Sequence, residues 1–168
     1  MIRKLTLIPV LLALVVFASC SKKDYLLVID SSGSMAERNT LKRVKASMPG
    51  FLDAFEKGDR VTLLQFDTSV REVVSVELKG DAERKQLQTA IEDMKAKGLH
   101  TDMAALLLDL KQRAAAMEKE GRKAQIIVLT DGLDDPRPGQ GRKKGQVDLG
   151  QFRSADESPL KESFVYYI

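Results

Sequence analysis

The chain has 168 residues, of which 43% are hydrophobic and 30% charged, a balance that is typical of one globular domain and excludes a disordered tail. The formal net charge is +3, and it falls to +1 without Arg3 and Lys4, which lie in a segment that we expect to be removed. A nearly neutral domain gives no reason to expect a nucleic acid as partner.

The first 19 residues have the pattern of a secretory signal peptide. Arg3 and Lys4 are followed by an apolar stretch from Leu5 to Phe17 and then by two small residues. The stretch is shorter than the roughly 20 residues that span a bilayer as a helix, and Pro9 interrupts it. We therefore expect residues 1–19 to be cleaved and the protein to be exported.

Cys20 is the only cysteine, so the chain cannot form an internal disulfide. The sequence Phe17-Ala18-Ser19-Cys20 resembles the bacterial lipobox, which implies that Cys20 is lipidated and begins the mature chain. The alternative is a plain secreted protein with a free thiol. An acyl anchor would hold the domain at a membrane of the cell envelope, and Ser21 resembles the pattern of outer-membrane lipoproteins, where an outer membrane exists.

Apolar runs alternate with segments of helical periodicity after this leader. Tyr25 to Ile29 is apolar at successive positions, which predicts a strand buried on both faces. Apolar residues at three- and four-residue steps predict a helix from Glu37 to Lys57, which Pro49 should kink or interrupt. Gly58 should end this helix, and Val61 to Phe66 predicts the second strand.

A short polar hairpin at 67–69 leads into a third strand, Val70 to Leu78. Its apolar residues recur at period two, which predicts an antiparallel strand at the sheet edge. The following segment predicts a helix that Asp81 caps and Gly98 ends. Both the hairpin and the helix are local features that turn residues delimit.

The second half of the chain predicts one helix and two strands. Residues 99–102 form a brief loop before a helix from Met103 to Glu120, and Gln125 to Leu129 is the fourth strand. Residues 133–159 form a long polar loop. A fifth strand begins at Ser163, and we expect the domain to be incomplete beyond it.

Two charged groups within the long loop are interpreted as solvated. Asp134 and Asp135 are expected to be rim charges near the site. The basic run Arg142-Lys143-Lys144 is expected to be a solvated loop tip, with a ligand site as the less favoured reading.

The alternation of strands and helices predicts the fold class. We expect a Rossmann-like three-layer α/β/α domain over residues 24–168, with a mostly parallel central sheet and one antiparallel edge strand. Ligands of such sheets bind at the carboxyl ends of the strands.

Oxygen-bearing side chains gather where the predicted strands end. If the first and fourth strands are neighbours, three loops meet at one edge of the sheet. The candidate metal ligands in these loops are Asp30, Ser32, Ser34, Thr101 and Asp131. Hydroxyls with few carboxylates and no sulfur favour Mg²⁺, and Mn²⁺ and Ca²⁺ are the alternatives.

Asp30-x-Ser32-x-Ser34, Thr101 and Thr130-Asp131-Gly132, in this order, resemble the metal-ion-dependent adhesion site of von Willebrand factor type A domains. The resemblance implies that Ser32 and Ser34 bind the metal directly, that Thr101 binds directly or through water, and that Asp30 and Asp131 act largely through waters. It also implies a protein-binding module and not an enzyme, in which an Asp or Glu of a partner protein completes the metal coordination.

Two other functions were weighed. Ser34, His100 and Asp131 could form the nucleophile, base and orienting acid of a serine hydrolase, although the Gly-x-Ser-x-Gly elbow is missing. A metal-independent scaffold in an envelope complex, working with an ATPase of the MoxR type as some family members are thought to do, is the other. His100, the only histidine, is expected to be a loop residue beside the site.

Overall fold

A five-stranded sheet with the order β3-β2-β1-β4-β7 forms the centre of the computed structural model, which describes residues 22–146 and 164–167. β1 is parallel to both β2 and β4, β4 is parallel to β7, and β3 is antiparallel to β2 at the edge. The strands are β1 Asp24–Asp30, β2 Arg60–Phe66, β3 Val70–Glu77, β4 Ala124–Thr130 and β7 Phe164–Tyr167. The predicted fold class and the antiparallel edge strand are confirmed.

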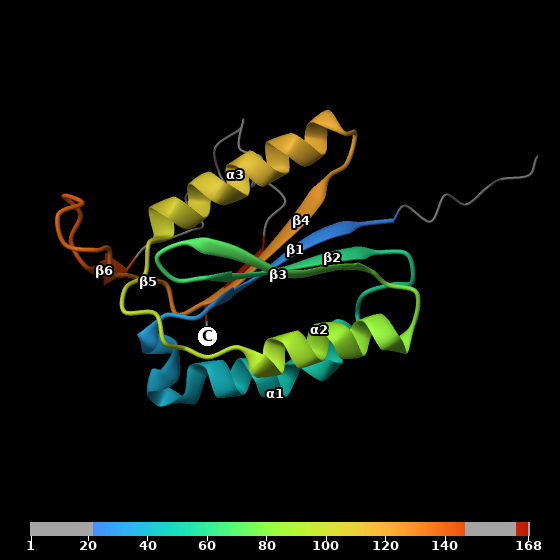
Figure 1. Ribbon diagram of the computed structural model, residues 1–168, viewed down its shortest axis with the longest axis horizontal. Coiled ribbons are helices and arrows are strands. Elements are labelled where there is room, and N and C mark those ends of the chain that lie inside the picture. Colours follow the sequence, from blue (N-terminus) through green and yellow to red (C-terminus); the bar gives the residue numbers. More distant parts are fainter. Residues whose placement is uncertain (1–21, 147–163, 168) are drawn as a thin grey trace, which may run out of the picture.

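Helices cover both faces of the sheet (Figure 1). α1 (Thr40–Leu52) and α2 (Asp81–Asp93) lie on one face, and α3 (Met103–Lys119) lies on the other. A 3₁₀ helix, η1 (Gly33–Asn39), precedes α1, and β5 (Leu133–Asp134) pairs with β6 (Gly145–Gln146) in a separate ribbon. No helix in the described ranges is long and apolar enough to cross a membrane.

β1 separates two apolar cores, which is why its sequence is apolar at successive positions. Tyr25, Leu27 and Ile29 pack on the face covered by α1 and α2. Leu26 and Val28 pack on the opposite face with the apolar side of α3. The prediction of a strand buried on both faces is therefore confirmed.

α1 and α2 satisfy each other's last carbonyl groups. Lys45 Nζ on α1 donates to the carbonyls of Glu92 and Met94, at 2.6 Å each. Arg84 on α2 donates to the carbonyl of Leu52 at the end of α1. Since the last four carbonyls of a helix lack partners within it, these cations stabilise both helix ends.

The predicted helix from Glu37 to Lys57 was wrong at both ends, and the interruption that Pro49 could have caused does not occur. Asn39 adopts a left-handed conformation, with φ of 56°, which separates η1 from α1. α1 then continues past Pro49 to Leu52, where the Pro49 carbonyl accepts a hydrogen bond from the backbone N–H of Asp53. Pro49 removes one backbone donor, but the helix and its hydrogen bonds continue beyond it.

The predicted ends of the next helix were also wrong. Gly80 is the N-cap, Asp81 is the first helical residue, and Glu83 accepts the backbone N–H of Gly80 at 2.9 Å. α2 ends at Asp93, well before Gly98. The expectations for residues 1–19, for Cys20 and for the stretch from 147 to 163 lie outside the described residues.

Candidate metal centre

The carboxyl ends of β1 and β4 lie side by side, because the two strands are neighbours from Asp24 to Ile29. The chain leaves β1 toward β2 on one side, while β4 lies on the other side, so this edge is a topological switch point. Asp30 ends β1 and Thr130 ends β4. The sheet therefore brings two of the three predicted loops together.

Asp30 is fully buried, at 0% exposure. Its Oδ1 accepts the backbone N–H of Ser32 at 2.8 Å, and its Oδ2 accepts the hydroxyl of Thr130 at 2.7 Å. Burial raises the pKa of Asp30 to about 6, hydrogen bonds from Ser32 and Thr130 offset part of this rise, and the charge of Asp131 adds to it. Within the described ranges, Asp30 has no cationic partner.

The two serines after β1 lie close to each other. Ser32 Oγ and Ser34 Oγ are 3.0 Å apart, with Ser32 buried and Ser34 half-buried. The loop is held from below by Ser31, whose backbone N–H and hydroxyl both donate to the Phe66 carbonyl at the end of β2. Both hydroxyls are therefore positioned by the tip of the sheet.

Thr101 lies in the third loop, which is attached to the other two by its backbone. The N–H and carbonyl of Thr101 pair with the carbonyl and N–H of Asp135, at 2.9 Å each, four residues beyond Asp131. The Gly98 carbonyl accepts the N–H of Gly33 at 2.7 Å. Thr101 is 2% exposed, and its hydroxyl makes no hydrogen bond within the described residues.

Gly98 has a structural role that the sequence analysis missed. A Cβ atom at this position would lie 2.5 Å from the Asp67 Cβ and 3.2 Å from the Ser32 Cα. Only glycine allows the loop before Thr101 to approach the β1 tip this closely. The hydrogen bond from the Asp102 N–H to the Asp67 carbonyl, 2.8 Å, holds the loop from its other end.

Asp131 begins the loop after β4. Its Oδ1 accepts the N–H of Leu133 at 3.1 Å, and Thr130 Oγ1 accepts the N–H of Gly132 at 3.0 Å while it donates to Asp30. Thr130 therefore orients the Asp30 carboxylate, a role that the sequence analysis did not assign. The sequence feature that could have indicated this role is the hydroxyl residue at the end of a predicted buried strand.

The expectation for Asp134 was wrong, because its side chain is buried. The basic run is exposed, as expected, although Arg142 and Lys144 form ion pairs there. Asp134 is 5% exposed and accepts the N–H of Met103 at 2.9 Å. Arg142 donates to Asp134 Oδ2 at 3.3 Å and to Asp102 Oδ1 at 2.6 Å. Lys144 pairs with Asp135 at 2.9 Å. These ion pairs attach the loop after β4 to the loop that carries Thr101.

Asp102 also caps α3 by accepting the N–H of Ala105 at 2.9 Å. Burial raises the pKa of Asp102, but the hydrogen bonds from Ala105 and Arg142 outweigh it and hold the pKa below its ordinary value. The predicted start of this helix at Met103 is confirmed. The Asp102 carboxylate interacts with the Arg142 guanidinium and with the N-terminus of α3.

The alternative catalytic triad is not assembled. Ser34 is hydrogen-bonded to Ser32, Asp131 accepts a backbone N–H, and His100 Nδ1 is buried without a hydrogen-bond partner in the described part of the chain. No hydrogen bond joins Ser34, His100 and Asp131 within these ranges. A nucleophile without a base in contact has no support for proton removal.

The donor set fits a hard divalent cation. No cluster of three His, Cys, Asp or Glu side chains that could hold a metal occurs among the described residues. The candidate donors are two carboxylates and three hydroxyls from the three loops described above. Mg²⁺ is bound by one or two carboxylates and keeps several waters, so this mixture suits it better than a cage of carboxylates would suit Ca²⁺.

The fold and this edge of the sheet define a Rossmann-like α/β domain whose polar loops meet at the strand ends. The family model for the von Willebrand factor type A domain matches residues 25–133, and the chain belongs to this family.

The chain is also similar to one curated relative in sequence and to solved structures in fold. An uncharacterized protein of Synechocystis sp. is 35% identical over 110 residues, which are 65% of this chain and 25% of that protein. The chain thus spans about a quarter of this relative. A von Willebrand factor type A structure from Catenulispora acidiphila has a TM-score of 0.57 at 21% identity, over 67% of this chain and 27% of that one. The pilus adhesin SpaC from Lactobacillus rhamnosus GG has a TM-score of 0.51 at 22% identity, over 67% and 16%.

Proposed function

We propose that this domain is a metal-dependent protein-binding module. Mg²⁺ is held at the sheet edge by Asp30, Ser32, Ser34, Thr101 and Asp131, and an Asp or Glu of a partner protein completes its coordination. The observation that carries the proposal is the Asp30 carboxylate, which is fully buried and has only uncharged donors within the described residues.

The physical argument concerns the cost of a buried charge. An ionised carboxylate that leaves water costs several kcal/mol unless a charge of opposite sign compensates it. The N–H of Ser32 and the hydroxyl of Thr130 compensate Asp30 only in part, because burial still raises its pKa to about 6. The nearby charge of Asp131 increases the cost, and a divalent cation near both carboxylates would remove it.

Family membership supports a role in protein interaction, and the likeness in fold to a pilus adhesin is consistent with it. Because the direct ligands would be neutral hydroxyls and the carboxylates of Asp30 and Asp131 would act largely through waters, a bound Mg²⁺ would keep a coordination position for one more oxygen ligand. Such an ion attracts an external carboxylate. We propose no catalytic role for the hydroxyls.

We further propose that lipid on Cys20 anchors the domain at the surface of a cell-envelope membrane. β1 begins at Asp24, four residues after Cys20, and runs away from that end to Asp30. Seven residues of strand span roughly 20 Å. The anchor would therefore lie at the amino end of β1, and the metal centre would face away from the membrane.

The metal is tested by thermal unfolding in Mg²⁺ and in EDTA. Wild type is expected to gain about 2.7 kcal/mol of stability when free Mg²⁺ is 100 times its dissociation constant. Asp30→Ala and Asp131→Ala are expected to lose this gain, while Asp93→Ala, which removes an exposed carboxylate at the end of α2, keeps it. Mn²⁺ and Ca²⁺ titrations rank the alternative ions. A wild type indifferent to all three ions would refute the metal centre.

The anchor is tested separately with an alkynyl palmitate label in a bacterial host. Wild type is expected to incorporate the label and to fractionate with membranes, while Cys20→Ala does neither. Label on both proteins, or on neither, would refute the anchor without affecting the metal centre.

A further inference from the structure

A hollow of about 560 Å³ lies beside the candidate metal centre. Its walls come from the β2–β3 hairpin, from residues 98–100 and from Arg137 with Pro138. These segments are far apart in the sequence. The hollow is therefore formed by the fold and not by one loop.

The hollow and the metal loops share their framework. Gly98 lines the hollow, and its carbonyl accepts the N–H of Gly33 between the two candidate serine ligands. Asp67, which also lines the hollow and lies against Gly98, accepts with its backbone carbonyl the N–H of Asp102, the residue after Thr101. A partner that reached a metal at the strand tips would thus also lie over the hollow.

The positive charge of the hollow resides in Arg137. The other arginine, Arg71, is used within the fold, because its guanidinium makes two hydrogen bonds to Asp67, at 2.7 and 3.2 Å. Arg137 is exposed and donates one hydrogen bond, to Thr68 Oγ1 at 3.1 Å. Within the described ranges it forms no ion pair. A guanidinium with unused N–H groups binds a carboxylate in a two-point geometry.

Leu99 and His100 indicate which other groups of a partner could bind beside Arg137. Leu99, next to Gly98, is 88% exposed, and a large apolar side chain with this exposure at a polar rim can pack against an apolar residue of a partner. The His100 ring also lines the hollow, and its Nδ1 lacks a hydrogen-bond partner among the described residues. Rotation of the ring toward the hollow would bring this nitrogen to a partner's oxygen atom.

We propose that the hollow is a second binding subsite for an acidic peptide segment of the partner. One carboxylate of the segment binds at the metal, a second binds Arg137, and an apolar side chain between them packs on Leu99. This inference rests on the proposed metal centre, and it adds the chemistry of the partner: two acidic residues separated by an apolar one, where the metal alone requires a single carboxylate.

The test uses fluorescent synthetic peptides of defined composition. Each peptide has one Asp, a Leu next to it, and either Glu or Gln beyond the Leu, two to four residues from the Asp. Affinity is measured by fluorescence anisotropy in Mg²⁺ at 150 mM salt. At one spacing the Glu peptide is expected to bind about tenfold tighter than its Gln counterpart. Arg137→Gln is expected to abolish this ratio, whereas Lys85→Gln, which removes an exposed charge on α2, leaves it unchanged.

The outcomes separate the two proposals. Equal affinity of the Glu and Gln peptides at every spacing, or a ratio that survives Arg137→Gln, overturns the second subsite even if binding depends on Mg²⁺. Loss of the thermal response of the wild type to Mg²⁺ overturns the metal centre instead. Leu99→Ser is expected to weaken every Leu peptide several-fold and to leave matched Ser peptides unchanged, and no change in the Leu peptides contradicts the apolar contact.

Discussion

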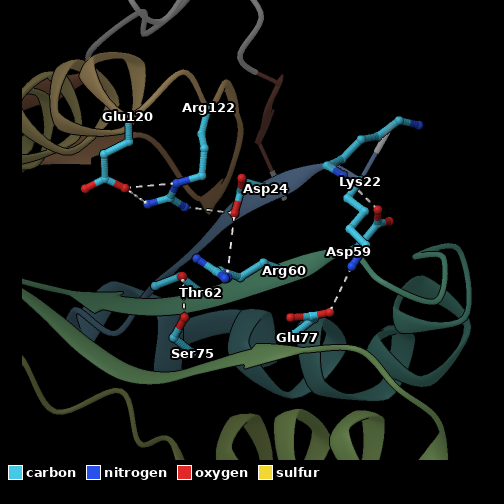
Figure 2. Close-up of polar contacts among 10 residues, drawn as sticks. Lys22, Asp24, Asp59, Arg60, Thr62, Ser75, Glu77, Glu120 and Arg122 are labelled. Carbon is cyan, nitrogen blue, oxygen red and sulfur yellow. Dashed lines mark hydrogen bonds and ion pairs between the residues drawn. The ribbon is translucent and has the colours of Figure 1, made fainter. Parts of the chain in front are cut away.

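The two ends of β1 each carry an aspartate, and the fold treats them in opposite ways. At the amino end, Asp24 lies 3.0 Å from Arg122 and 3.9 Å from Arg60, and Arg122 also pairs with Glu120 at 2.6 Å (Figure 2). At the carboxyl end, Asp30 accepts the backbone N–H of Ser32 and the hydroxyl of Thr130, and it pairs with no cation among the described residues.

The difference separates a region where ion pairs stabilise the fold from a region where a buried carboxylate is available to bind a ligand. The amino end is partly exposed and its carboxylates are matched by arginines, so these pairs contribute little stability. Asp30 at the carboxyl end is buried and pairs with no cation among the described residues, so its charge lowers the stability of the metal-free protein. Uncompensated buried charge is a feature of functional sites. Four substitutions test this contrast.

The largest effect is expected for Gly98→Ala, which attacks the framework of the carboxyl end. The new Cβ would lie 2.5 Å from the Asp67 Cβ, so either the loop or the hairpin must move. We expect a loss of about 3 kcal/mol in the free energy of unfolding, together with loss of the Mg²⁺ response.

Gly50→Ala is the control for this substitution, because a Cβ at that helical position would have no atom within 4 Å apart from its chain neighbours and the backbone of its own helix. It is expected to leave stability unchanged or to raise it by up to about 1 kcal/mol. Urea unfolding of both variants measures the difference. Equal stability of the two variants would contradict the close approach at Gly98.

Asp30→Asn tests the buried charge directly. The pKa of Asp30 is about 6 in the folded protein against 3.8 ordinarily, so the folded state holds the proton more tightly than the unfolded state. In EDTA, the contribution of Asp30 to stability is therefore present below pH about 4 and is lost as the pH rises to about 6. At pH 7.5, Asp30→Asn is expected to be more stable than wild type by about 2 kcal/mol.

The measurement is urea unfolding across pH 3.5 to 7.5 in EDTA, then at pH 7.5 in Mg²⁺. The stability difference between the two proteins should grow between pH 4 and 6, and Mg²⁺ should stabilise only wild type. A difference that does not vary with pH would show that burial of Asp30 carries no cost.

Arg142→Gln tests a part of the carboxyl end where charge is compensated. Asp102 and Asp134 are both buried, and Arg142 donates to each of them. Its loss leaves two carboxylates without their cation, and we expect a cost of about 1–2 kcal/mol by thermal unfolding. Lys144→Gln, which breaks an exposed pair with Asp135, is expected to cost less than about 0.5 kcal/mol. Similar costs for both would contradict the role of burial.

The smallest effect is expected at the amino end. Arg122→Gln removes the pairs with Asp24 and Glu120, which lie partly in solvent. We expect the free energy of unfolding to fall by less than about 1 kcal/mol. In 1 M NaCl the difference in stability between this variant and wild type should largely disappear, because salt screens exposed ion pairs. A decrease of more than about 2 kcal/mol in the free energy of unfolding that does not depend on salt would contradict the proposed difference between the two ends of β1.

Local pattern was sufficient to predict most of the fold. The successive apolar residues of β1 indicated burial on two faces, and the period-two pattern of Val70 to Leu78 indicated an edge strand. Both predictions were possible because the spacing of apolar residues depends on whether one or two faces of a strand are buried. The start of α3 at Met103 was also predicted from local pattern, although Asp102 was not assigned as its cap. Pro49 misled because a proline is costly in a helix on average, while α1 continues through it.

The sequence by itself predicted the five strands of the main sheet and the approximate positions of the three α-helices, and it supplied the five candidate metal ligands, since each follows from residue types over a short window. Only the tertiary structure decided that Gly98 meets Asp67, that Arg142 joins Asp102 to Asp134, and that Arg137 reaches a hollow beside the metal loops. The partners in these contacts are separated by up to 69 positions, as for Arg137 and Thr68. Periodicity shows that a residue is buried but not what it touches, so such contacts follow only from the order of strands and the course of the loops.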